Sequence, residues 1–223
     1  VNGNVSDGLV SDGATLTVNG NVTGNGINTV VAKKGTVTVN GTVTATDLNR
    51  QTGVLASNGS KLTVGDTEVG GKESTGVIAE SGSKATAGNV KVSGEYMTGA
   101  SACGDSTVHV TATGENSVGI DGETGTIKVG GDVSGIEAVV ARGEADVTVG
   151  GSVSGTLSGI VAVGNASVSV KGDAETKVGP GVFAQENATV TVDGNVTGGT
   201  FYEAPEGYEY VYPAIIAGAG TTV

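Results

Sequence analysis

Five residues in the middle of the chain could carry out chemistry if the fold brought them together. Asp121, Glu123 and Arg142 supply two carboxylates and a guanidinium. A polysaccharide lyase or glycoside hydrolase needs such groups around the bond that it breaks. His109 could act as an acid or a base, and Cys103 could act as a nucleophile. Asp121 and Glu123 are the one closely spaced carboxylate pair in this set. We interpret His109, the single His of the chain, as a solvated strand residue and Cys103 as an inert corner thiol.

A repeat that runs through the whole chain has to position these residues. Each unit opens with a small residue, an aliphatic residue, any residue and then Ala. Successive copies start 19 to 24 residues apart, apart from a last interval of 33. Such a period is typical of solenoid coils. The clearest copies are 53–56, 76–79, 159–162 and 181–184, and weaker copies start at Gly8, Thr29, Gly99, Gly119, Ala138 and Ala214.

Each unit contains three strand-like segments. The opening block is followed by a Val-x-Val segment, such as 147–149, and then by a short segment after a Gly turn, such as 130–133. Apolar and polar residues alternate with the period of a strand that buries one face. Gly, Asn and Asp at the corners supply the positive φ that sharp turns need. The pattern predicts an all-β fold, a parallel β-helix of about ten coils of about 22 residues with three strands per coil.

The Gly-Val-x-Ala block and the Val-x-Val-x-Gly-x-Val run resemble the right-handed parallel β-helix repeats of bacterial surface and adhesin-like proteins. The resemblance covers the whole chain and implies the right-handed coil, a single domain over residues 1–223 and a secreted or cell-surface location. Both ends fall inside a repeat, so we expect a fragment of a longer chain. The resemblance indicates no single ligand, because the same scaffold also carries lyases and phage spikes.

Charge and composition limit the partners. The chain has 11 basic and 23 acidic residues, a net charge of −12. It should therefore repel nucleic acid and anionic membranes. No run approaches the roughly 18 apolar residues of a membrane-spanning segment. With one Cys the chain can form no internal disulfide, and no motif calls for a metal or another cofactor.

The third position of the opening block is apolar in most coils, although the alternation points it outward. Stacked at coil spacing, these residues predict an apolar stripe along the rod. Such a stripe usually marks an interface with a partner or a second copy. The alternative is that another segment of the same protein covers it. The stripe consists of Val10, Val31, Leu55, Ile78, Val140, Val161, Phe183 and Ile216, interrupted by Ser101 and Asp121.

The long last interval holds an aromatic insertion over residues 198–213. We expect a small hairpin that turns at 205–207. Tyr offers a flat ring and a polar tip at low entropic cost, which suits recognition of a sugar or a basic peptide. The alternative is that the insertion folds over Phe183 and Ile216 and shields the end of the stripe. Its candidate contact residues are Phe201, Tyr202, Tyr208, Tyr210 and Tyr212.

The sequence therefore favours a non-catalytic scaffold or adhesin-like segment. It would contact a cell-surface glycan or protein through the apolar stripe, chiefly Leu55, Ile78, Val140, Val161 and Phe183, and through the aromatic insertion. One alternative is a carbohydrate-active β-helix enzyme that uses Asp121, Glu123 and Arg142. Another is a purely structural spacer.

Overall fold

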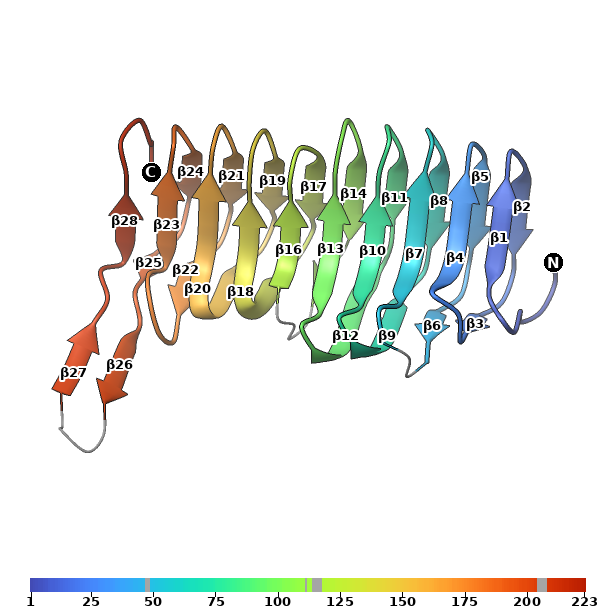
Figure 1. The fold of residues 1–223 in the computed structure, drawn as a ribbon, viewed down its shortest axis with the longest axis horizontal. Coiled ribbons are helices and arrows are strands. Elements are labelled where there is room, and N and C mark those ends of the chain that lie inside the picture. Colours follow the sequence, from blue (N-terminus) through green and yellow to red (C-terminus); the bar gives the residue numbers. More distant parts are fainter. Residues whose placement is uncertain (47–48, 111, 114–117, 204–207) are drawn as a thin grey trace.

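A computed structural model describes residues 1–46, 49–110, 112–113, 118–203 and 208–223. Every strand pairing in this part of the chain is parallel except that of one hairpin, and each strand pairs with its counterpart in the neighbouring coils. The chain is thus a parallel β-solenoid with three strands per coil, as predicted. In Figure 1 the front strands run upward, the second strands lie behind them, and successive coils advance to the left, which makes the coil right-handed.

The first strand of each coil carries the Gly-Val-x-Ala block. Val54 pairs with Val30 on one side and with Val77 on the other, so like residues stack on like. These strands form the front sheet of Figure 1. They are β1 (Leu9–Asp12), β4 (Asn28–Lys33), β7 (Thr52–Ser57), β10 (Thr75–Ala79), β13 (Thr98–Ala102), β16 (Val118–Gly122), the second half of β18 (Val133–Ala141), the second half of β20 (Val153–Val163), β23 (Val182–Gln185) and β28 (Ile215–Ala217).

In the described part of the chain, the second strands form a separate sheet of nine, one fewer than the ten first strands. Their outward positions carry mostly Thr, Lys and Ser, and their inward positions carry Val, Leu, Ile and Ala. They are β2 (Thr15–Val18), β5 (Thr36–Val39), β8 (Lys61–Val64), β11 (Lys84–Thr86), β14 (Thr107–Val110), β17 (Thr126–Val129), β19 (Asp146–Val149), β21 (Ser167–Val170) and β24 (Thr189–Val192).

Among the residues that the structure describes, the third strands join the first strands in one sheet of 17, because β18 and β20 run unbroken through the corner between the two sets. The remaining third strands are separate and mostly short. They are β3 (Val22–Gly24), β6 (Val43–Ala45), β9 (Thr67–Lys72), β12 (Asn89–Glu95), β15 (Ala112–Thr113), β22 (Ala174–Thr176) and β25 (Val196–Thr197). A hairpin of β26 (Thr200–Glu203) and β27 (Tyr208–Val211) follows them.

The interior is a narrow column of Val and Ala with a few larger residues. Val54 and Val77 are fully buried, and so are Ala56 and Ala79 two positions later. Leu62, Ile120, Ile127 and Ile160 are among the largest buried side chains. A single coil could not enclose this column, so the stack of coils supplies the stability.

The opening Gly of the block lies where the first strand comes close to a third strand. A Cβ on Gly53 would lie 2.7 Å from Thr67 Cγ2, 2.7 Å from Val69 Cγ2 and 2.8 Å from the carbonyl oxygen of Gly76. Gly is required there because no larger side chain fits. In the coil where Thr29 takes this position, the facing residue is Gly24.

At the corner between the second and third strands, side-chain oxygens link one coil to the next. The amide of Asn21 donates a hydrogen bond to Asn4 Oδ1 at 2.9 Å, and the amide of Thr42 donates to Asn21 Oδ1 at 2.9 Å. The amide of Asn195 donates to Asp173 Oδ1 at 2.7 Å in the same way. Asn4, Asn21 and Asp173 do not adopt the predicted positive φ, so they act at this corner by satisfying backbone donors of the following coil.

Three successive coils carry a longer corner between the third and first strands. Arg50, Glu73 and Tyr96 adopt positive φ at equivalent places in this corner. Arg50 Nε lies 2.7 Å from Glu73 Oε2, Lys72 Nζ lies 3.0 Å from Glu95 Oε2, and Lys72 Nζ also lies 5.3 Å from the centre of the Tyr96 ring. These contacts between coils hold the corners in register.

Candidate functional site

The structure places the predicted apolar stripe on the outer side of the first-strand sheet, in register. Leu55 pairs with Val31 and Ile78, and Val161 pairs with Val140 and Phe183. Leu55, Ile78, Val161 and Phe183 are half-buried, because stacked neighbours cover their flanks. The stripe is therefore a partly covered ladder rather than an open apolar surface.

Val140 has to be removed from the predicted contact residues, because its side chain is only 1% exposed. It lies between Asp121 and Val161 in the ladder. Arg142, two residues further along the same strand direction, reaches back so that its Nη1 lies 2.7 Å from Asp121 Oδ1. A short valine beside this ion pair has little surface left to offer. Val31 is also buried, with 4% of its surface exposed.

The candidate catalytic residues do not converge. Asp121 is occupied by Arg142, and this pair is largely solvated, with 36% and 53% of the two side chains exposed. Glu123 is exposed. His109 lies on β14 in the nine-stranded sheet, where its backbone pairs with Lys128, whereas Asp121 lies in the other sheet. In the part of the chain that the structure describes, no three His, Cys, Asp or Glu residues could together hold a metal ion.

Cys103 follows β13 and is half-buried. Partial burial, together with the nearby carboxylates of Glu80 and Glu123, raises the pKa of the Cys103 thiol above its ordinary value of 9.0. Both causes disfavour the thiolate, which is the nucleophilic form. A cysteine with a raised pKa is a poor catalytic nucleophile near neutral pH.

Cys103 should therefore react slowly with iodoacetamide. The rate should reach half its maximum only above pH 9.0, because the pKa of the Cys103 thiol is raised above that ordinary value and the thiolate is the reactive form. Replacing Glu80 and Glu123 together by Gln should move the midpoint of the rate profile to lower pH, since both carboxylates raise the pKa. Mass spectrometry of the alkylated protein over a pH series measures this. A midpoint below 9.0 in the wild-type protein would contradict the prediction.

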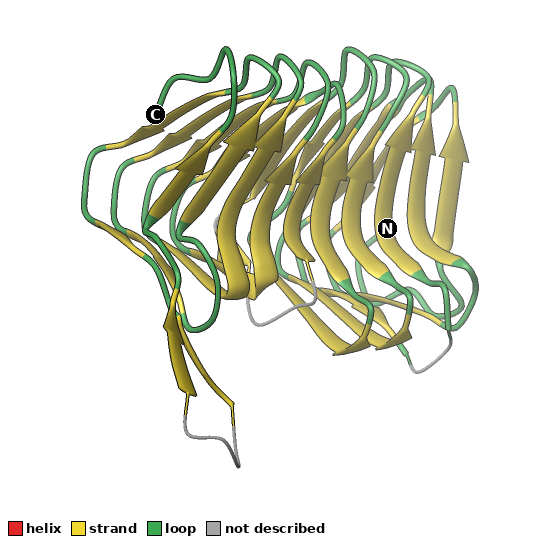
Figure 2. Cartoon of the chain, turned by 60° about the vertical axis from the view of Figure 1, so that its left-hand side comes forward, coloured by secondary structure: helices red, strands yellow, loops and turns green. Residues whose placement is uncertain are grey.

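The aromatic insertion forms the predicted antiparallel hairpin. Its register pairs Phe201 with Tyr210 and Glu203 with Tyr208. The hairpin leaves the coil at the corner between third and first strands and points away from the body of the rod (Figures 1 and 2). It therefore does not fold over Phe183 and Ile216, and the shielding interpretation is wrong.

The end of β27 and the residue after it carry exposed aromatic and apolar side chains. Tyr210 is 51% exposed, and Val211 and Tyr212 are also exposed. The amide of Thr200 donates to the carbonyl of Lys177 at 3.0 Å, so the base of the hairpin is tied to the preceding coil. The turn at 204–207 and the side chains of Phe201, Tyr202 and Tyr208 lie outside the described part of the chain.

Sequence reasoning missed a second apolar surface at the same corner of the rod. Tyr96, Val118, Ile136 and Leu157, which we call the apolar corner, line an open groove of about 560 Å³ together with Glu95 and Glu137. Tyr96 is 68% exposed, Ile136 44% and Leu157 51%. The available signal was an aliphatic residue where other coils turn, two positions before the opening Gly or Ala of the block.

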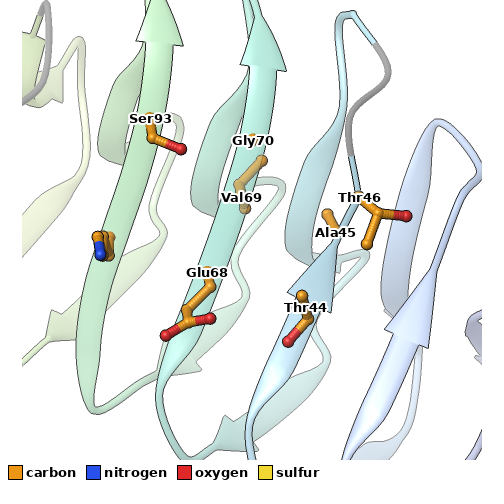
Figure 3. A pocket seen from close by; sticks show the side chains of 8 residues that line it. Thr44, Ala45, Thr46, Glu68, Val69, Gly70 and Ser93 are labelled. Atoms are coloured by element: carbon orange, nitrogen blue, oxygen red, sulfur yellow. The ribbon is translucent and has the colours of Figure 1, made fainter.

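A smaller polar groove lies on the outer side of β6, β9 and β12 (Figure 3). Its volume is about 210 Å³, and its lining includes Thr44, Glu68, Lys91 and Ser93. Gly70 leaves a gap in one row of side chains, where it pairs with Ser93. Glu68 and Lys91 occupy paired positions in adjacent strands, where opposite charges stabilise a sheet. The groove is thus accounted for as a solvated sheet face.

Comparison with known proteins adds no family. No protein-family model matches the chain, and neither a curated protein nor a solved structure gives a significant match. In the described ranges, no helix has the length and hydropathy needed to cross a bilayer.

Proposed function

We propose that this chain is a non-catalytic binding scaffold, an adhesin-like segment of a secreted or cell-surface bacterial protein. The single observation that carries the proposal is the projecting hairpin of β26 and β27 with exposed Tyr210, Val211 and Tyr212. A soluble protein has little reason to hold such side chains away from its core unless they meet a partner.

The partner class that suits this hairpin is a cell-surface glycan or a protein. A tyrosine ring stacks on the apolar face of a sugar while its hydroxyl forms hydrogen bonds, and it loses little side-chain entropy on binding. The apolar stripe would extend the contact along the rod through Leu55, Ile78, Val161 and Phe183. These side chains are half-buried, so the stripe would be a secondary contact surface. The stacked coils would hold the hairpin at a fixed position on a stiff support.

Replacing Tyr210 by Ala should weaken binding at least tenfold, the loss expected for an aromatic anchor residue. A glycan array with the labelled protein finds the ligand, and titration calorimetry with the best glycan measures the affinity. Tyr96→Ala is the matched control, because Tyr96 is also an exposed tyrosine but lies away from the hairpin. Its affinity should stay unchanged. Equal losses in both variants, or no loss in Tyr210→Ala, would refute the role of the hairpin.

The carbohydrate-active enzyme makes a different prediction. Incubation with candidate polysaccharides and an assay for new reducing ends or unsaturated products should give no turnover under our proposal. Turnover that Asp121→Ala abolishes would overturn the scaffold interpretation. Asp121 is the residue to replace because it forms an ion pair with Arg142 on the outer face of the first-strand sheet.

A further inference from the structure

Two of the four residues of the apolar corner, Ile136 and Leu157, come from coils that turn without a break in their strands. β18 and β20 run through the corner, and Glu137 on β18 pairs with Ser158 on β20. Ile136 and Leu157 immediately precede these two residues, so they occupy equivalent places one coil apart. Both are about half exposed. Equivalent positions in earlier coils carry Ser74 and Met97, which are buried because those coils have the longer corner.

The groove beside these residues is apolar but carries negative charge. Tyr96 and Val118 continue the apolar surface toward the N-terminal coils. Glu95 lines the groove and already pairs with Lys72 at 3.0 Å. Glu137 also lines the groove, and among the described residues no basic side chain forms an ion pair with it. Within the described ranges, the carboxylate of Glu137 is therefore an anion beside apolar side chains that no ion pair balances.

This charge decides which occupant fits. A second copy of the chain would bring another Glu137 and a further net charge of −12 to the groove, and like charges would oppose the contact. A partner with apolar residues and a Lys or Arg side chain would cover Tyr96, Ile136 and Leu157 and neutralise Glu137 at the same time. An arginine suits this place best, because its guanidinium binds a carboxylate with two hydrogen bonds and also stacks on a tyrosine ring.

We propose that the apolar corner is a docking site for a protein segment in which basic side chains alternate with apolar ones. The site is distinct from the hairpin and does not depend on the proposed function. Apolar contact supplies most of the affinity, and the Glu137 carboxylate selects for positive charge.

Fluorescence anisotropy with the labelled peptide Leu-Arg-Leu-Arg-Leu-Arg-Leu tests the proposal, with the matched peptide Leu-Glu-Leu-Glu-Leu-Glu-Leu as the comparison. The basic peptide should bind and the acidic one should not. Leu157→Ser should weaken binding of the basic peptide about tenfold, as for an exposed side chain that anchors an interface. Ile27→Ser removes another exposed aliphatic side chain, one that does not line the groove, and should leave the affinity unchanged.

A pair of charge variants separates the site from the general acidity of the protein. Glu137→Gln and Glu144→Gln change the net charge equally, but Glu144 does not line the groove. We expect Glu137→Gln to weaken binding several-fold and Glu144→Gln to leave it unchanged. Equal effects of the two, or binding insensitive to Leu157→Ser, would overturn the proposal. Binding of neutral oligosaccharides that Leu157→Ser abolishes, without binding of the basic peptide, would overturn it too. All four residues are exposed or lie at the surface, so these variants should fold, and circular dichroism checks this.

Discussion

Replacing Ile120 by Ala should lower the free energy of unfolding by about 2–5 kcal/mol, the range for removing a large aliphatic side chain from a packed core. Ile120 is fully buried and pairs with Ala100 on one side and Val139 on the other. Its small neighbours cannot expand into the space that it leaves. The narrow interior therefore keeps most of the resulting cavity.

Urea denaturation followed by circular dichroism measures this change. Ile136→Ala is the matched control, because it removes the same atoms from a side chain that is 44% exposed. Its effect should stay within about 0.5 kcal/mol, as for most surface substitutions. If the two isoleucines gave equal losses, Ile120 could not lie in a packed interior and the stacked fold itself would be in question.

Replacing Gly53 by Ala should destabilise the protein by about 1–3 kcal/mol, the cost of overpacking a filled site. A Cβ at Gly53 would lie 2.7 Å from methyl groups of Thr67 and Val69 and 2.8 Å from the carbonyl oxygen of Gly76. One added methyl group must therefore displace a strand of the next coil. The carbonyl group is part of the backbone and cannot move away alone.

Gly26→Ala is the control for this effect. The nearest atom to a Cβ at Gly26 is the carbonyl oxygen of Asn28 at 3.9 Å, and its backbone does not adopt a positive φ. Thermal unfolding of the two variants should show a large drop in Tm for Gly53→Ala and little change for Gly26→Ala. A stabilised Gly53→Ala variant would show that the first and third strands do not approach each other at this place.

The sequence predicts the stacking of this fold because equivalent positions in successive repeat units carry similar residues, and these are the residues that pair between coils. Val54 and Val77 occupy the same place in two units, and the alternation around them identifies the buried face. The period-2 rule fails at Gly53, which is buried next to the buried Val54. Gly53 lies at the corner, where its Cα faces Thr67, Val69 and the carbonyl group of Gly76. These contacts come from other strands, so the alternation within one repeat unit does not predict them.

The surfaces were harder to predict than the core. The pattern correctly indicates that Leu55 and Val140 point to one side, but exposure depends on neighbours that come from other coils. Arg142 reaching back to Asp121 leaves Val140 covered, and no local pattern encodes that reach. Likewise the hairpin follows from the turn residues between two aromatic segments, whereas its direction depends on the corner from which it starts. Ile136 and Leu157 went unnoticed because corner positions follow no alternation.

The hairpin interrupts the chain without interrupting the rod. Val182 on β23 pairs with Ile215 on β28, although the excursion at 198–213 lies between these two strands. The framework thus closes over an added segment as long as the two ends of that segment return to adjacent places. Binding loops at this corner could lengthen, shorten or be exchanged for others while the coils keep their order. The loops at this corner can therefore change in sequence and length while the buried ladders that fold the coils stay the same.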